Sequence, residues 1–284
     1  MLPDAFCGEG PWLQSLNNIN SVEHDSGETN ISWAAFHASS SHITPPPVSA
    51  ISRLLPLFRD TAHSIAMIRH SMDIIKKSVY NLNPGQIPVL TVDQPLYAIA
   101  KRIQWNWPGS HGEDHFVIVL GGLHIEMAAM KVAGDWLQSS GWTHVLVEAG
   151  VTSSGIAESM LHAAHVKRTR HVHEITAATL YLLQQQAYDQ YVAALDNETT
   201  ALDFICWCAE CSEKYPQFCY WATTMQLELL ILHFVGTIRQ SNFAQYIASL
   251  SNLIPCFFCH GSYQLCSLGL SPYTRYASTA FIAS

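Results

Sequence analysis

The sequence predicts an α/β fold, in which a mostly parallel or mixed sheet carries flanking helices and is followed by a helical C-terminal part. Three short apolar runs lie between residues 87 and 148, and helical patterns separate them. A helix between consecutive strands is typical of a parallel sheet, because the chain must cross over before it can start the next strand. Beyond residue 150 the apolar residues recur mainly at helical spacing.

The first strand is predicted at Ile87–Val92, a run of β-branched and aliphatic residues that ends at the carboxylate of Asp93. A helix follows from Pro95, because proline is favoured in the first helical turn. Its apolar residues repeat at helical spacing until Pro108 interrupts the pattern. Asp93 is therefore expected to stand between the end of a strand and the start of a helix.

The second strand is predicted at Phe116–Leu120, and two glycines then turn the chain into a helix over Leu123–Leu137. His124 and Glu126 fall in the first turn of that helix. Gly141 ends the helical pattern, and Trp142–Val147 is predicted as a third strand that ends at Glu148. The carboxyl ends of these three strands are expected to share one edge of the sheet.

The domain organisation follows from composition. Residues 1–48 mix polar residues with isolated aromatic residues and are predicted to form an irregular N-terminal arm, which Trp12, Trp33 and Phe36 anchor to the body. Residues 49–255 are predicted to form a single α/β domain with helical additions. These additions include a helix over 175–195 with one apolar stripe and one or two buried helices over 226–250; the stripe consists of Leu180, Leu183, Ala187 and Tyr191.

Charge and composition exclude several classes of protein. A net charge of −8 with only 14 Lys and Arg residues excludes a protein that coats nucleic acid nonspecifically, because neutralising phosphates requires a basic face. No apolar run approaches the roughly 20 residues of a membrane span, and the N-terminus lacks a secretory signal pattern. We therefore expect an intracellular protein, in the nucleus or the cytoplasm, without a membrane partner. Its eight cysteines are expected to be thiols or metal ligands.

An acidic metal site is the first candidate for chemistry. Asp93, Glu126 and Glu148 all lie at or just past predicted strand ends, and His124 lies beside Glu126. Carboxylates that converge on one edge can bind Mg²⁺, which prefers oxygen ligands. Asp93, Glu126 and His124 are the candidate catalytic residues, and Asp93, Glu126 and Glu148 the candidate metal ligands. The alternative is that each carboxylate only caps a helix or stabilises a turn.

A zinc site is the second candidate. His124 and Glu126 followed by Cys256 and Cys259 match the pattern of zinc deaminases, in which one His and two Cys bind the metal and Glu transfers the proton. More than a hundred residues separate the two halves, so a chance match is favoured. Cys206, Cys208 and Cys211, with Cys219 beyond, could form a structural zinc site with four thiolates, but Cys206 and Cys208 lie too close together for the usual knuckle, and we expect buried free thiols.

A basic cluster over residues 167–173 is the third candidate. Lys167, Arg168 and Arg170 are the residues that would contact a phosphate backbone, which makes DNA the candidate partner. A single basic run of this length more often forms a solvated helix face. Both interpretations stay open at the level of the sequence.

Several segments resemble a family of uncharacterised proteins that is multiplied in cnidarians and other aquatic animals and is derived from mobile elements. The resemblance spans most of residues 30–255. Its motifs are NISWAAFHAS (30–39), LLPLFRDTAHS (54–64), NPGQIPVLTVDQPLYAIAKRIQWNWP (83–108), GGLHIEMAAMKVAGDWLQSSGW (121–142) and PQFCYWATTMQLELLILHFVGTIRQSNF (216–243).

The resemblance implies a transposase-like protein with a ribonuclease H-like core, in which acidic residues bind Mg²⁺ for DNA strand transfer. Asp93 matches the Asp-Gln motif of the family, and His124 and Glu126 match its Leu-His-Ile-Glu-Met motif. The catalytic roles of these three residues are carried over by analogy alone.

The chain departs from the family after residue 255. Family members continue with an Asp-His-Thr-Asn-Tyr-Ala-Arg-Trp motif, whereas this chain reads HGSYQLCSLGL over 260–270. One set of codons that encodes this peptide spells the missing motif when it is read one nucleotide later. We therefore predict that residues 256–284 form an out-of-frame, disordered tail. The expected function is that of a degenerate, truncated DNA-handling protein whose incomplete acidic site gives no turnover.

Overall fold

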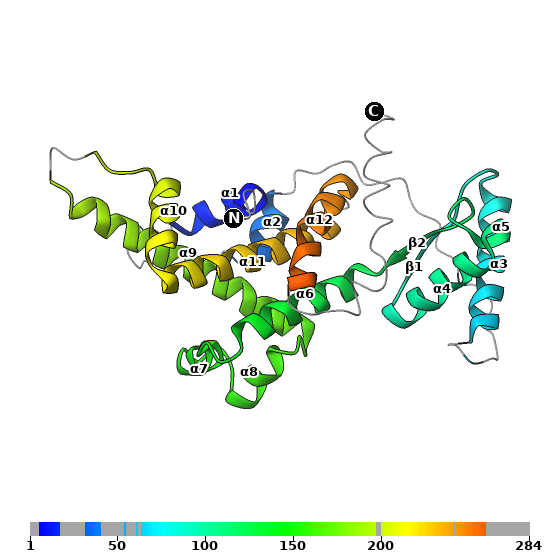
Figure 1. Ribbon diagram of the computed structural model, residues 1–284, viewed down its shortest axis with the longest axis horizontal. Helices are drawn as coiled ribbons and strands as arrows, with labels where there is room; N and C mark the ends of the chain where they lie inside the picture. The colour runs from blue at the N-terminus through cyan, green and yellow to red at the C-terminus, as the bar shows by residue number, and fades with distance from the viewer. Residues whose placement is uncertain are drawn as a thin grey trace. The chain divides into compact units, whose positions relative to one another are not determined.

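Helices dominate the computed structural model, which describes residues 6–17, 32–40, 54, 61, 64–196, 200–240 and 242–259 (Figure 1). The helices are α1 (Phe6–Asn17), α2 (Trp33–Ser40), α3 (Ile65–Leu82), α4 (Gln94–Asn106), α5 (Pro108–His111), α6 (Gly122–Leu137), α7 (Trp142–Glu148), α8 (Ser154–Met160), α9 (Val166–Ala193), α10 (Phe204–Lys214), α11 (Pro216–Arg239) and α12 (Phe243–Cys259). Two strands complete the described residues, β1 (Val89–Val92) and β2 (Val117–Leu120).

The chain divides into two compact units, which are described separately. The strand unit contains α3, β1, α4, α5, β2 and the start of α6 up to Glu126. The helical unit contains α1, α2, the rest of α6 from Met127, and α7 to α12. Residues 49–255, which the sequence predicted as one domain, are divided between these two units.

The predicted α/β class is wrong, because the described residues contain no sheet larger than the two four-residue strands. β1 and β2 pair in parallel, with Val89 opposite Val117 and Val92 opposite Leu120. The predicted order of strand, helix and strand is correct for residues 89–120. The third predicted strand is absent, and with it the flanked sheet that a ribonuclease H-like core requires.

Residues 142–148 form α7 instead of the predicted third strand. Trp142 and Leu146, four residues apart, are 4% and 5% exposed, whereas Val145 is 62% exposed. This is the periodicity of a helix with one buried face. A short apolar run does not by itself distinguish a strand from a helix, and burial of one face by tertiary packing decided between them.

Local chemistry explains the remaining elements of the strand unit. The Asp93 side chain caps α4 by accepting a hydrogen bond from the Leu96 amide at 3.0 Å. Gln104 of α4 donates to the Phe116 carbonyl just before β2 at 2.9 Å, which ties the crossover helix to the sheet. The His111 ring stacks on Phe116 with 5.7 Å between the ring centroids. Together these contacts fix the crossover between the two strands.

The core of the helical unit is formed by α11, which contacts α9, α10, α12 and α1 (Figure 1). More than half of its residues are buried, including Leu229, Ile231 and Phe234, each fully enclosed. By length and composition α11 is also apolar enough to cross a membrane, unlike any run expected from the sequence. Because 61% of its most apolar window is buried within the protein, it has the character of a core helix.

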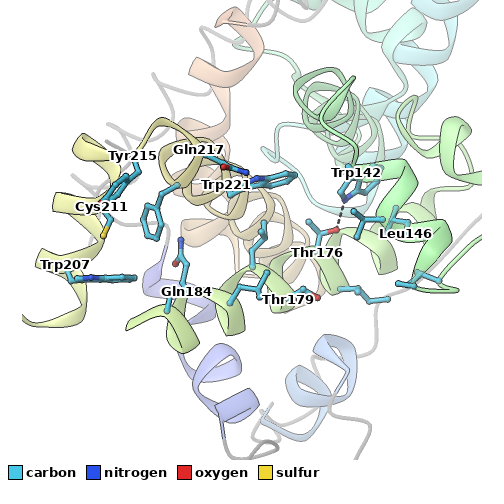
Figure 2. A pocket seen from close by; sticks show the side chains of 18 residues that line it. Trp142, Leu146, Thr176, Thr179, Gln184, Trp207, Cys211, Tyr215, Gln217 and Trp221 are labelled. Atoms are coloured by element: carbon cyan, nitrogen blue, oxygen red, sulfur yellow. Dashed lines mark hydrogen bonds between the residues drawn. The ribbon is translucent and has the colours of Figure 1, made fainter. Parts of the chain in front are cut away.

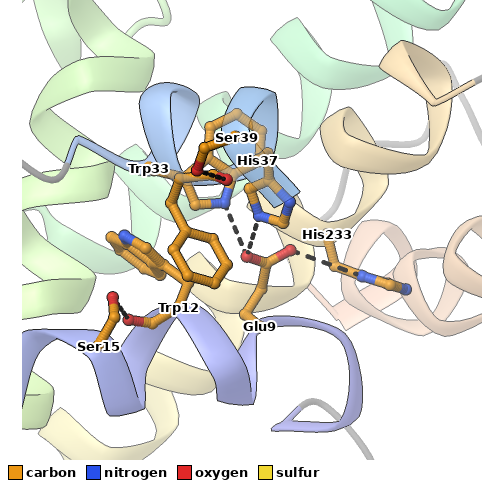
Figure 3. A network of polar contacts seen from close by, with 8 residues as sticks. Glu9, Trp12, Ser15, Trp33, His37, Ser39 and His233 are labelled. Atoms are coloured by element: carbon orange, nitrogen blue, oxygen red, sulfur yellow. Dashed lines mark hydrogen bonds and ion pairs between the residues drawn. The ribbon is translucent and has the colours of Figure 1, made fainter. Parts of the chain in front are cut away.

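The predicted irregular arm is corrected by α1 and α2, which belong to the helical unit. Trp12 and Trp33 are 2% and 1% exposed, so the predicted anchoring role of these aromatic residues is confirmed. Figure 3 shows the polar network beneath them, in which Glu9 accepts a hydrogen bond from the Trp33 indole at 2.7 Å. The imidazole of His37 lies 2.8 Å from the same carboxylate oxygen. His233 of α11 lies 3.7 Å from the other oxygen, so the network ties α1 and α2 to α11.

We predict that replacing Gly134 by alanine destabilises the helical unit by about 3 kcal/mol, because α6 approaches the backbone too closely to accept a methyl group. A Cβ at Gly134 would overlap the carbonyl group of Leu161. Chemical denaturation of the Gly134→Ala variant measures the loss. Gly155→Ala is the matched control, since nothing lies within 4 Å of a Cβ there and alanine favours the helix. Equal stability of both variants would contradict the close approach.

Candidate functional site

An apolar groove of about 760 Å³ in the helical unit is the candidate site. Figure 2 shows its lining, with α9 side chains facing those of α7 at one end and those of α10 and α11 at the other. The lining residues are Trp142, Val145, Leu146, Ala149, Val151, Ile175, Thr176, Thr179, Leu180, Leu183, Gln184, Ala187, Trp207, Cys211, Tyr215, Gln217, Phe218 and Trp221. Segments that lie between positions 142 and 221 of the sequence therefore form one surface.

The groove follows from the spacing of apolar residues along α9. Leu180, Leu183 and Ala187 belong to the stripe that the sequence predicted, and all three line the groove. The same helix also packs against α11, which supplies part of the opposite lining. Leu183 is 54% exposed, so much of its side chain is open to the groove and the solvent. The stripe thus lines a binding surface in addition to supporting the core.

The lining carries no Asp, Glu, Lys, Arg or His side chain and is dominated by five aromatic residues, Trp142, Trp207, Tyr215, Phe218 and Trp221. Burial is the main cause that raises the pKa of the Cys211 thiol, with a smaller contribution from Glu210. Cys211 therefore stays protonated and neutral at pH 7. The groove accordingly offers contact area and dispersion, and no fixed charge.

Contacts within the protein fix Trp142, which forms one wall of the groove. The Trp142 indole donates a hydrogen bond to the Thr176 hydroxyl at 2.9 Å, and that hydroxyl donates to the Val172 carbonyl at 2.9 Å. The same indole stacks on His173, with 5.5 Å between the ring centroids. The indole N–H of Trp142 and the hydroxyl of Thr176 therefore both have hydrogen-bond partners within the protein.

Gln184 is the exception among the polar groups of the lining. Its residue is 8% exposed, and its Oε1 atom is buried without a hydrogen-bond partner. Leaving a buried amide oxygen unpaired costs about 1–3 kcal/mol.

The residues of the predicted magnesium site are only partly brought together. Asp93 directly follows β1 as expected, but its carboxylate caps α4. His124 and Glu126 lie in the first turns of α6, as predicted, and Glu126 is 3% exposed. Glu148 ends a helix of the other unit and so does not follow a strand. Within the described residues, no group of three His, Cys, Asp or Glu residues is arranged to bind a metal ion.

The residues of the predicted zinc site belong to different units, with His124 and Glu126 in the strand unit and Cys256 in α12 of the helical unit. The side chain of Cys259 and residues 260–284 lie outside the described residues, and with them most of the predicted out-of-frame tail. α12 nevertheless continues through the proposed frameshift point to Cys259, and Phe257 is 1% exposed. Residues 256–259 therefore extend a helix of the core.

The cysteines of α10 are free, as predicted for Cys206, Cys208 and Cys211. Burial raises the pKa of Cys208 to about 12, so this thiol is not ionised at neutral pH. Cys206 is exposed and Cys208 and Cys211 are only partly buried, so the expectation that all three are buried is wrong.

The basic cluster occupies the first turns of α9. Lys167 and Arg168 are exposed, and Arg170 is partly buried. No acidic residue accompanies them in the first turn, although the helix dipole favours negative charge there. Their role in DNA binding stays a prediction.

The fold and the groove together define a largely helical protein with a ligand-sized apolar site. Residues 32–204, more than half of the chain, match the family model described as a domain of unknown function, DUF8702, and the chain belongs to this family. No curated protein and no solved structure matches the chain. The matched segment includes the α7 and α9 walls of the groove but ends at the start of α10.

Proposed function

We propose that the helical unit is a binding module for a neutral, apolar small molecule. The observation that carries the proposal is the groove of about 760 Å³ with an uncharged, largely apolar lining. Sites for small molecules typically measure about 300–1,000 Å³ and are lined mainly by apolar and aromatic side chains with a few polar groups.

The driving force for such binding is the removal of apolar surface from water, worth about 25 cal/mol per Å². Five aromatic side chains supply large, rigid contact surfaces, and little side-chain entropy is lost when a ligand packs on them. Trp142 is already fixed by its bond to Thr176, so this wall is prepared for binding before the ligand arrives.

A groove of this kind does not suit DNA, since binding to phosphates needs cations and the lining contains none. The DNA-handling function implied by the mobile-element resemblance would have to use the exposed Lys167 and Arg168 instead. Binding of an apolar molecule has a defined cavity in the structure, whereas DNA binding has only an exposed basic turn of α9. The cavity is therefore the better-supported site.

We predict that Thr179→Trp blocks the groove. Thr179 lines the groove from α9 and is exposed, so an indole there fills the cavity without entering the core. The wild-type protein is expected to bind the neutral fluorophore N-phenyl-1-naphthylamine with an increase in its emission. The dissociation constant of the variant should rise at least about tenfold, which corresponds to about 1.4 kcal/mol.

Gln186→Trp is the matched control, because Gln186 is exposed on the same helix and does not line the groove. This variant should bind the fluorophore like the wild type. If the wild type gives no saturable signal, or if both tryptophan variants bind equally, the groove is not a binding site for apolar molecules.

A further inference from the structure

We infer that the ligand of the groove is an apolar carbonyl compound, a ketone or an ester, whose carbonyl oxygen accepts a hydrogen bond from the Nε2 atom of Gln184. This inference rests on the proposed binding function and specifies its ligand class. The observation behind it is a polar side chain that lines the groove, belongs to a residue only 8% exposed, and has no hydrogen-bond partner among the described residues.

The two polar atoms of the Gln184 amide differ in their access to the groove. Oε1 is enclosed by the protein, with less than 1 Å² of accessible surface, so a ligand does not reach it. Nε2 is not enclosed in this way, and Figure 2 shows the amide nitrogen pointing into the groove. At this point the groove therefore presents a hydrogen-bond donor and no accessible acceptor.

The surroundings of Gln184 along α9 are apolar, since Leu180, Leu183 and Ala187 line the groove beside it. Little of the residue is open to water, so an N–H group without a partner is unfavourable there until an acceptor reaches it. A ligand that fills the groove with apolar groups and carries one acceptor satisfies this donor.

A hydroxyl group suits this position less well than a carbonyl group. A hydroxyl oxygen also accepts a hydrogen bond, but the group adds a donor of its own. The Oε1 atom is out of reach, and the Thr176 hydroxyl already accepts from Trp142 and donates to Val172. A hydroxyl proton beside Gln184 would therefore be left without an acceptor, which is unfavourable in an apolar site.

An ionised carboxylate also accepts hydrogen bonds, but its charge does not suit the groove. The lining contains no cation, and one neutral amide compensates little of the cost of burying a carboxylate. The exposed charged residues close in sequence to lining positions are mainly acidic and disfavour an anion: Glu148, Asp189, Glu210 and Glu213, with Lys214 as the one cation among them. A carbonyl group, which is neutral and accepts without donating, fits these conditions.

Displacement of N-phenyl-1-naphthylamine by four ligands of similar size tests the inference. The ligands are 2-nonanone, 2-nonanol, 2-methyl-1-nonene and nonanoate. The ketone and the alcohol share one carbon skeleton, so their comparison isolates the added donor. The wild-type protein should bind 2-nonanone about five- to tenfold more tightly than 2-nonanol, as expected when a hydroxyl donor is left unpaired in an apolar site, and nonanoate most weakly.

Replacing Gln184 by methionine removes the donor and keeps a side chain of similar length. Gln184→Met should weaken 2-nonanone binding about fivefold and leave the binding of 2-methyl-1-nonene unchanged, because a CH₂ group stands in place of the carbonyl oxygen in the alkene. An unchanged affinity for the ketone in a folded Gln184→Met variant overturns the inference.

Gln217→Met is the control, because it replaces an exposed glutamine of the same groove and should keep the wild-type affinity for the ketone. Infrared spectroscopy of bound 2-nonanone tests the same contact without a variant, since a hydrogen bond lowers the carbonyl stretching frequency. On the wild-type protein this frequency should lie below its value in hexane.

Two results on the wild type overturn the inference while leaving the binding function intact. One is an affinity for 2-nonanol that equals or exceeds that for 2-nonanone, and the other is a carbonyl frequency equal to that in hexane. Absence of binding by the fluorophore and by all four ligands overturns the binding function itself. Because both wild-type results are decisive, the test stands even if Gln184→Met does not fold.

Discussion

Replacing Glu228 by leucine is expected to lower the free energy of unfolding by about 3 kcal/mol, because it removes the carboxyl group that faces a buried imidazole in the core of the helical unit. The Glu228 Oε2 atom lies 2.7 Å from the His173 Nδ1 atom, and both side chains are fully buried. Despite this distance, none of the four nitrogen and oxygen atoms of the pair has a well-aligned hydrogen bond. Removal of one partner therefore leaves the other buried without compensation.

A double-mutant cycle separates this pairing from simple loss of packing. His173→Leu alone should also be strongly destabilising, whereas the variant with both replacements should recover most of the loss, since two leucines fill the space without buried charge. Urea denaturation of the four proteins gives the coupling energy. If the double replacement costs the sum of the single ones, the two side chains do not act as a pair.

The second large effect is expected from Glu9→Gln, which should make stability far less dependent on acidic pH. Burial by itself raises the pKa of Glu9, but contacts from His233, His37 and Trp33 outweigh it and lower the pKa from 4.5 to about 2. The His233 contact of 3.7 Å is too long for a hydrogen bond, so we attribute more of the lowering to His37 and Trp33.

The sign of the pH effect follows from this lowered pKa. The ionised Glu9 contributes its full stabilisation above pH 4.5, the value for the unfolded chain, and loses it as the pH falls through about 2. A shift of this size corresponds to about 3 kcal/mol. Between pH 5 and pH 2 the wild type should therefore lose about 3 kcal/mol more than Glu9→Gln, while at pH 7 the variant should be the less stable protein.

Denaturation midpoints at pH 7, 5, 4, 3 and 2 measure this difference. The other carboxylates titrate alike in both proteins and cancel in the comparison. Glu213→Gln removes one charge from an exposed position and should retain the wild-type pH profile. Parallel profiles for the wild type and Glu9→Gln would show that the network in Figure 3 does not stabilise the ionised form.

Much of the strand unit could be predicted from sequence, because local interactions specify it. Pro95 and the Asp93 carboxylate start α4, and β1 and β2 are short β-branched runs bounded by turn residues. The prediction failed at residues 142–147, where a short apolar run fits both a strand and a helix. That one error changed the fold class, since it supplied the third strand of a sheet that the described residues do not form.

The apolar groove could not be predicted from the sequence, because its walls come from segments far apart in the chain. The acidic residues were predicted to bind a metal ion because carboxylates are common metal ligands. A carboxylate after a strand is equally suited to capping a helix, as Asp93 does. The stripe that contains Leu180 and Leu183 was visible in the sequence. Its exposure to a cavity was not, because the opposite wall, including Trp221, comes from helices far along the chain.

The sequence by itself determined the helix boundaries that depend on caps and periodicity, the two short strands and the uncharged character of the α9 stripe. Only the tertiary structure decided that α7 is a helix, that His173 meets Glu228, and that side chains from α7, α9, α10 and α11 line one groove. The physical reason is that local structure depends on neighbours within a few residues. Burial, ion pairing and cavities depend on which distant segments pack together, and hydrophobic packing is not directional enough to be read from either segment alone.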